Sequence, residues 1–420
     1  MTLHKQKGMA ARRVWPLFVV IGGALGCVAP AFAQQDEDGR YSSVLDLPRK
    51  GYEPRTIQMG ALVLRPELDV DGEYDSNIYA AQSNKVDDFI LIAAPRLDFN
   101  LDHDTLQFGA ETFATFRRYA DRTSEDSTTF GGKAHLTLKP TAMSSLAGGI
   151  GLVRAMEDRG DPEARILTGI GPRRFNDFSG ELSYRITGAR LGVQASGEVH
   201  KFNYLSALDD ERDHTSYRGA LRGVYRMSAL MSLFMQGYVN RRAFRLATDN
   251  EGIGRNATTY GGSLGVQIDP GGKLRGEANA GVFRFDPDDT ILKPYTGIQF
   301  GANLSYALTP RSAITFSAFR GDVATVRNGA TARTDTRLVL GLDQEVRHNL
   351  LYKMAVSWRE TNFRGTSEQQ RVWGGNAELE YLFNRHVSLA ASGRYAHRNS
   401  NVPGQDYERF RAGLVLRLKY

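Results

Sequence analysis

The chain has 420 residues, a formal net charge of +6, 44 glycines, 39 phenylalanines and tyrosines together, 14 prolines and one cysteine. A single cysteine excludes an intrachain disulfide and a metal site built from several thiolates. Abundant glycine and aromatic residues beside few prolines favour β-structure, and the small cation excess gives no support for a nucleic-acid partner.

Residues 1–33 have the organisation of a secretory signal peptide. Four basic residues precede the apolar run "WPLFVVIGGALGCVAP", and the small residues of "AFA" follow it. We predict cleavage after Ala33, with lipidation at Cys27 as the alternative. Cleavage would remove Cys27 and leave a mature chain with a net charge of about +2. The chain is therefore predicted to be exported.

Residues 34–59 lack periodicity, begin with acidic and polar residues, and contain Pro48 and Pro54. We predict a periplasmic extension that lies in the mouth of the domain that follows and could plug it. A disordered leader is the alternative.

From residue 60 to residue 420, apolar and polar residues alternate in eighteen segments, each long enough to cross a bilayer as a tilted strand. Short connections such as "TPRS" alternate with long ones such as residues 155–175, 241–257 and 361–371. This pattern predicts an all-β fold, a transmembrane antiparallel barrel of eighteen strands, with sixteen as the fallback. A soluble β-sandwich or propeller fits less well, because only a closed barrel satisfies every backbone group in hydrocarbon.

The segment "FRAGLVLRLKY" closes the chain. Its apolar row is predicted to face lipid, and the intervening basic row is predicted to face the lumen. An apolar row that ends in an aromatic residue resembles the C-terminal signal by which the barrel-insertion machinery recognises outer-membrane proteins. The residues of this predicted insertion signal are Phe410, Leu414, Leu416, Leu418 and Tyr420.

Charged residues dominate the predicted luminal rows. The first strand is acidic and the last two are basic, so opposite charges should meet where the barrel closes. The seam acids are Glu67, Asp69, Asp71 and Glu73. The basic residues predicted to line a path for an anionic glycan are Arg218, Arg222, Arg226, Arg394, Arg398, Arg409, Arg411 and Arg417. Among them, Arg218, Arg222 and Arg226 are expected to form a ladder that no acid compensates. The alternative to a path for a glycan is that the charges at the seam form cross-strand salt bridges that support closure of the barrel.

The stretch from "RKGYEP" through Gly60 and Pro66 to "YDSNIY" resembles the β-barrel porin type 2 family of outer-membrane proteins. The residues of the second motif are Tyr74, Asp75, Ser76, Asn77, Ile78 and Tyr79. Tyr74 is predicted to lie in an aromatic girdle, the next three residues to hydrogen-bond the backbone of a turn, and the last two to pack over the loop.

The resemblance implies a role in exopolysaccharide or capsule export across the Gram-negative outer membrane, with a periplasmic polysaccharide-export protein as one partner. Outer-membrane lipid, including lipopolysaccharide, would surround the barrel. A diffusion porin for small solutes is the first alternative and an outer-membrane hydrolase a remote one. The sequence contains no hydrolase, zinc-protease or phosphate-loop motif, and we predict no cofactor, no catalytic residue and no metal. Calcium at the loop pairs Asp209–Asp210 and Asp288–Asp289 is less expected than two solvated loops.

Overall fold

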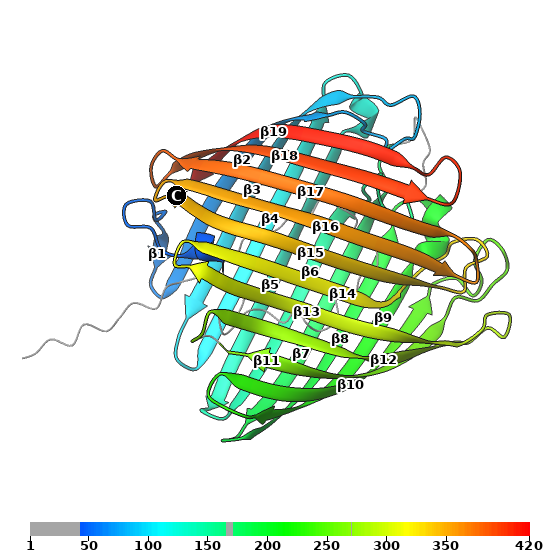
Figure 1. Ribbon diagram of the computed structural model, residues 1–420, viewed down its shortest axis with the longest axis horizontal. Helices are drawn as coiled ribbons and strands as arrows, with labels where there is room; N and C mark the ends of the chain where they lie inside the picture. Colours follow the sequence, from blue (N-terminus) through cyan, green and yellow to red (C-terminus); the bar gives the residue numbers. More distant parts are fainter. Residues whose placement is uncertain (1–42, 165–170, 270) are drawn as a thin grey trace, which may run out of the picture.

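The computed structural model (Figure 1) describes residues 43–164, 171–269 and 271–420. Eighteen strands, β2 to β19, each pair antiparallel with the next, and β19 pairs with β2 to close the barrel. The predicted signal peptide lies outside the described residues. No helix in the described ranges is long and apolar enough to span a membrane.

The strands are twelve to sixteen residues long and follow the chain in order around the ring. Their bounds are β2 (Leu62–Asp75), β3 (Asp88–Asp102), β4 (Leu106–Tyr119), β5 (Ser127–Thr141), β6 (Ser144–Met156), β7 (Arg174–Thr187), β8 (Leu191–Tyr204), β9 (His214–Arg226), β10 (Met231–Phe244), β11 (Ala257–Ile268), β12 (Leu274–Pro287), β13 (Tyr295–Thr309), β14 (Ser312–Val323), β15 (Ala332–Arg347), β16 (Leu350–Arg364), β17 (Gln369–Leu382), β18 (Val387–Ser400) and β19 (Tyr407–Lys419). The prediction of eighteen strands is confirmed.

Each strand has an apolar outer face because its side chains alternate with period two. On β19, Phe410, Leu414, Leu416 and Leu418 point outward with 37–60% of their surface exposed. Tyr420, just beyond the strand, is 51% exposed. Such a large exposed apolar surface suits contact with lipid rather than water. The five residues therefore lie where the sequence predicts them, and their role as an insertion signal stays a prediction.

The connections differ at the two ends of the barrel. Two to five residues join the strands at one end, such as 310–311 between β13 and β14, whereas the other end carries connections such as 157–173 and 245–256. The connection expected at 361–371 is only 365–368, because the ladder between β16 and β17 continues to Asn362 and Gln369. The C-terminus lies at the short-turn end (Figure 1). In outer-membrane barrels the short turns face the periplasm.

Opposite charges meet across the seam between β2 and β19. Lys419 lies 3.2 Å from Glu67, Arg417 lies 3.6 Å from Asp69, and Arg394 on the next strand lies 3.4 Å from Glu73. These pairs stand on the luminal face, next to a continuous backbone ladder that joins β19 to β2. The seam is thus closed by backbone hydrogen bonds and lined by ion pairs.

The N-terminal extension, as far as it is described, lies at the short-turn end. Its last residues form β1 (Ile57–Met59), which pairs with β2. Before β1, Ser43 hydrogen-bonds Asp343 and Arg49 lies 3.6 Å from Glu345, both on β15. Residues 43–59 therefore reach from β15 to β2 at the mouth. Residues 34–42 lie outside the described ranges, and a plugging role for the extension stays a prediction.

Candidate functional site in the barrel lumen

The connection between β6 and β7 begins with an acidic stretch that turns into the lumen. We call residues 157–164 the inward segment. Two ion pairs hold its start near its own strands: Glu157 lies 2.5 Å from Arg212 of the 3-10 helix η4 (Ala207–Arg212), and Arg159 lies 2.7 Å from Glu125. All four side chains are nearly buried, so each charge keeps a partner where water is scarce.

The rest of the inward segment reaches the opposite wall. Glu163 lies 3.3 Å from Arg333 on β15, and Asp161 lies 3.7 Å from Arg359 on β16. Asp158 lies 3.3 Å from Arg409 on β19. Because β6 and β15 stand on opposite sides of the ring, the inward segment spans the lumen and narrows it. These acids are not among the residues predicted from the sequence.

One buried carboxylate organises the wall that receives the segment. Asp335 on β15 has no exposed surface. Its oxygens lie 3.1 Å from Arg333, 3.0 Å from Arg337 and 2.7 Å from Arg359. Two of these arginines also bind the inward segment, so Asp335 holds them in the geometry that Glu163 and Asp161 meet. A carboxylate shared by several guanidinium groups is the kind of network that survives burial.

The "YDSNIY" motif ties the first strand to the last and to the inward segment. Asp75 is fully buried and accepts hydrogen bonds from Arg409, which also reaches Asp158. The backbone N–H of Phe410 donates to the Ser76 hydroxyl at 2.9 Å. Asn77 is fully buried, and its side-chain amide donates to the carbonyl of Glu408 at 3.0 Å.

The other motif residues support this closure. Tyr74 packs against Phe89 with ring centroids 5.2 Å apart, in the outward position expected for an aromatic girdle. Ile78 is 2% exposed. Arg159 of the inward segment lies over the Tyr79 ring at 5.7 Å. These contacts give the whole motif a structural role at the long-loop end of the seam.

The predicted basic ladder on β9 is wrong at its centre. Arg222 lies 2.8 Å from Glu277 and is therefore compensated. Arg218 stands opposite Glu198 in the ladder and lies over the Tyr238 ring at 3.8 Å. Arg226 is exposed at the short-turn end of the strand.

The remaining predicted luminal cations gather on β18 and β19. Arg398 donates to the carbonyl of Gln405 at 2.6 Å, and Arg417 lies 3.0 Å from both Glu378 and Glu380. Arg411 stands opposite Asp75 in the strand register. Of the seam acids, Asp71 is buried beside Glu73 on the same face. The wall is thus charged but largely paired, and a role of these residues in a substrate path stays a prediction.

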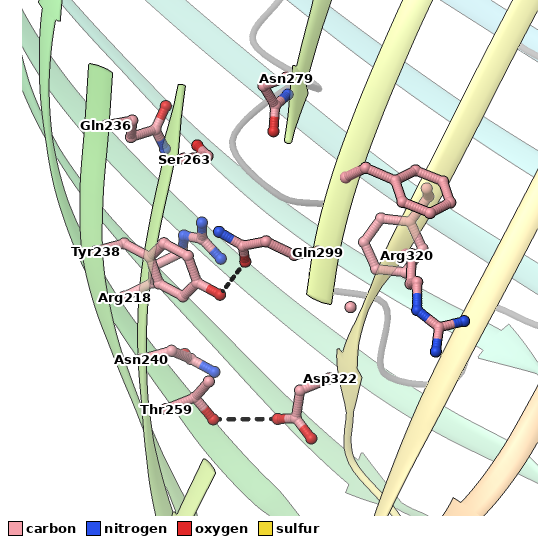
Figure 2. Close-up of a pocket in the computed structure, with 13 residues that line it drawn as sticks. Arg218, Gln236, Tyr238, Asn240, Thr259, Ser263, Asn279, Gln299, Arg320 and Asp322 are labelled. Carbon is pink, nitrogen blue, oxygen red and sulfur yellow. Dashed lines mark hydrogen bonds between the residues drawn. The ribbon is translucent and has the colours of Figure 1, made fainter. Parts of the chain in front are cut away.

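A pocket in the wall formed by β9 to β14 has a different chemistry (Figure 2). Its lining is mostly amides and hydroxyls, and Figure 2 shows these groups converging from neighbouring strands. The hydroxyl of Tyr238 donates to Gln299 at 2.6 Å, and that of Thr259 donates to Asp322 at 3.1 Å. The lining residues include Arg218, Gln236, Tyr238, Asn240, Thr259, Ser263, Asn279, Gln299 and Asp322.

The pocket lies beside an interruption of the barrel wall. The ladder between β13 and β14 ends at Phe300 and Arg320, so residues 295–299 and 321–323 do not pair with each other. Beyond this point Asp322 reaches Arg242 on β10 at 3.2 Å. The break lets polar groups of β14 reach inward and complete the pocket.

Gly261 lets Tyr238 lie flat against the wall of this pocket, because a Cβ atom there would stand 2.2 Å from the ring. We expect Gly261→Val to lower the free energy of unfolding by about 1–3 kcal/mol through overpacking. Urea unfolding in lipid vesicles measures this. The matched control is Gly237→Val on the adjacent strand, where the nearest atom is 4.0 Å away and the side chain would face lipid. Equal stability of the two variants would contradict the packing argument.

The inward segment contains a carboxyl group that titrates near neutral pH. Burial is the main cause that raises the pKa of Asp161 from 3.8 to about 7; Asp158 and Glu157 add to the increase, whereas Arg359 and Arg333 oppose it. Because the pKa of Asp161 is raised in the folded barrel, protonation of Asp161 at low pH stabilises the contact of the inward segment with the opposite wall. This stabilisation is lost as the pH rises through about 7.

We therefore expect the conductance of the barrel to be higher at pH 8 than at pH 5. The burial of ionised Asp161 costs more than its attraction to Arg359 returns, so ionisation weakens the contact of the inward segment with the opposite wall. Single-channel recording at both pH values measures this difference. Asp161→Asn, which cannot ionise, should conduct similarly at both. An unmodified barrel with the higher conductance at pH 5 would refute this assignment.

The two acidic loop pairs are not simply solvated. Asp209 is fully buried and lies 2.8 Å from Arg173, while Asp288 is bound by Arg241 at 2.5 Å. Asp289 accepts hydrogen bonds from the N–H groups of Gly254 and Ile291. Within the described residues, no group of three acidic, histidine or cysteine residues could hold a metal ion.

A closed antiparallel barrel with an apolar outer face and a charged lumen defines an outer-membrane porin-like channel. The chain belongs to the family described as "Putative beta-barrel porin 2", whose profile matches residues 50–420. This membership places the protein in the outer membrane of a Gram-negative bacterium. No curated protein matches the chain.

Three solved structures to which this chain is similar are remote from it in sequence. The outer-membrane protein OpdK from Pseudomonas aeruginosa is 13% identical, with a TM-score of 0.43, over 85% of this chain and 99% of that one. OccK2 (OpdF) from the same organism is 13% identical, with a TM-score of 0.45, over 85% and 97%. A mutant of the ferric enterobactin receptor PfeA, also from Pseudomonas aeruginosa, is 8% identical, with a TM-score of 0.41, over 85% and 80%. At this level of similarity nothing about solutes is carried over to this chain.

Proposed function

We propose that this barrel is a passive diffusion channel for small polar solutes. The observation that carries the proposal is the inward segment, which spans the lumen and is tied to the opposite wall at Arg333, Arg359 and Arg409. A lumen divided in this way leaves less room for a bulky polymer. The paired charges of segment and wall leave polar surfaces without a strong excess of one sign.

Reconstitution in planar bilayers tests this function. The purified chain should produce stepwise, voltage-independent increases in ion current at low voltage, with weak selectivity between potassium and chloride. An absence of steps from folded, heat-modifiable protein would contradict a diffusion channel. Strong rectification would contradict passive diffusion.

Export of an exopolysaccharide is the second candidate, favoured by the pocket of Figure 2. Amides and hydroxyls such as those of Gln236, Asn279 and Gln299 are well suited to hydrogen-bond sugar hydroxyl groups. Under this reading a periplasmic export protein would deliver the polymer. Secreted polysaccharide from a deletion strain, with and without the restored gene, separates the two candidates. Loss of secretion that the gene restores would favour export; unchanged secretion would favour small-solute diffusion.

A further inference from the structure

The outer wall of β6, β7 and β8 changes character along its length. Toward the short turns and through the middle, its outward residues are apolar and exposed: Ile150, Leu152, Phe178, Leu182, Tyr184, Ile186, Leu191 and Val193. Toward the long loops the outward positions of the same three strands carry Arg154, Arg174 and Lys201. We call these three residues the outer cation patch. A wall that passes from apolar to cationic in this way marks the boundary between hydrocarbon and headgroups.

The strand alternation fixes the direction of these side chains. Ile150, Leu152 and Arg154 follow one another at intervals of two residues and therefore share one face of β6. Ile150 and Leu152 are each 63% exposed, so this face is the outer one. The guanidinium group of Arg154 lies over the exposed Phe130 ring at 5.4 Å. The Arg154 side chain also donates to Asn176 of β7 at 3.0 Å. Lys201 stands opposite Phe178 in the ladder of β7 and β8. The patch therefore lies outside the barrel and contributes nothing to the lumen.

The patch differs from three other outward cations at this end. Arg118, Arg241 and Arg371 each have a carboxylate partner, at 3.8 Å, 2.5 Å and 3.0 Å respectively. Within the described part of the chain, none of the three patch residues forms an ion pair. Their positive charge is left available to an external anion.

We propose that the outer cation patch binds the phosphate groups of a phosphorylated glycolipid of the outer leaflet, the lipid A part of lipopolysaccharide. The long side chains reach up to the phosphates, and the acyl chains lie on Leu152, Phe178 and their apolar neighbours. The long-loop end faces outward in barrels of this type, which brings the patch to the depth of these headgroups. This surface is independent of the lumen and of the proposed passage of solutes.

The test measures binding of lipid A to the purified full-length chain in detergent by native mass spectrometry. We expect a triple variant, Arg154→Gln with Arg174→Gln and Lys201→Gln, to bind bis-phosphorylated lipid A at least about tenfold more weakly than the unmodified chain. The matched control removes three outward cations that already have carboxylate partners: Arg118→Gln, Arg241→Gln and Arg371→Gln. It should bind within about twofold of the unmodified chain.

Two further binding measurements separate recognition of the phosphate groups from other causes of binding. Dephosphorylated lipid A should bind the unmodified chain at least about tenfold more weakly, and inorganic phosphate at the same concentration should not compete, because it lacks the acyl contacts. A triple variant that keeps the three positive charges (Arg154→Lys, Arg174→Lys, Lys201→Arg) should bind lipid A as tightly as the unmodified chain. It controls for the effect of substitution at these positions. Equal binding by the glutamine variant, an equal loss in the control, or equal binding of dephosphorylated lipid A would overturn the proposal. If the glutamine variant does not fold, Lys201→Gln alone decides, with a loss of at least about twofold expected and no loss overturning it.

Discussion

Barrels that carry Asp158→Asn together with Glu163→Gln should conduct about two to five times more ion current per channel than the unmodified barrel. Both changes cut ties between the inward segment and the opposite wall. Neither change leaves a buried arginine without a carboxylate partner. Arg409 still forms an ion pair with Asp75, and Arg333 still forms one with Asp335. The segment should therefore leave the lumen more often while the barrel stays folded.

Single-channel recording in planar bilayers measures this increase. The matched control is Asp210→Asn together with Asp288→Asn, which removes two loop carboxylates that bind the exposed arginines Arg245 and Arg241 at 2.5 Å. Its conductance should equal that of the unmodified barrel. Unchanged conductance in the first double variant would mean that these two ties do not hold the segment.

The largest expected loss of stability follows Asp335→Asn. The substitution keeps the size of the side chain and removes the charge that three arginines share. Because breaking a buried pair leaves uncompensated charge, we expect the free energy of unfolding to fall by about 3–5 kcal/mol. Urea titration of the reconstituted barrel, followed by tryptophan fluorescence and electrophoretic mobility, measures the loss.

Asp288→Asn is the control for charge removal as such. Asp288 and Arg241 are both more than one third exposed, so their ion pair should contribute less than about 1 kcal/mol. A loss at Asp335 no larger than the loss at Asp288 would show that the network on β15 and β16 is not a source of stability.

The barrel could be predicted from the sequence because lipid imposes a strict rule on every strand. Outward residues such as Ile150, Leu264 and Leu414 must be apolar, and this requirement leaves a period-two pattern that a reader can find without coordinates. The charges at the seam follow from the same pattern, since the first and last strands of a closed barrel must pair. The strand bounds were predicted less accurately near the long loops, as at residues 361–371, where the strands continue through polar residues such as Thr361, Asn362 and Gln369.

The candidate site could not be predicted in the same way. The acids of "MEDRGDPEAR" sit in a long connection without periodicity, and their partners Arg333, Arg359 and Arg409 are far away in the sequence. The polar pocket was also missed, because Gln236 and Asn279 look like ordinary luminal residues until the strands are placed side by side. Conversely, Arg222 looked uncompensated because its partner Glu277 lies three strands away.

The solute-size limit of reconstituted vesicles tests the central claim most directly. Swelling rates would be measured with a series of neutral saccharides from one to six sugar units, for the unmodified barrel and for the Asp158→Asn, Glu163→Gln double variant. A channel narrowed by the inward segment should pass the smallest saccharides, exclude the longest, and lose part of this exclusion in the double variant. Equal passage of all six by the unmodified barrel would contradict the claim that the inward segment narrows the path.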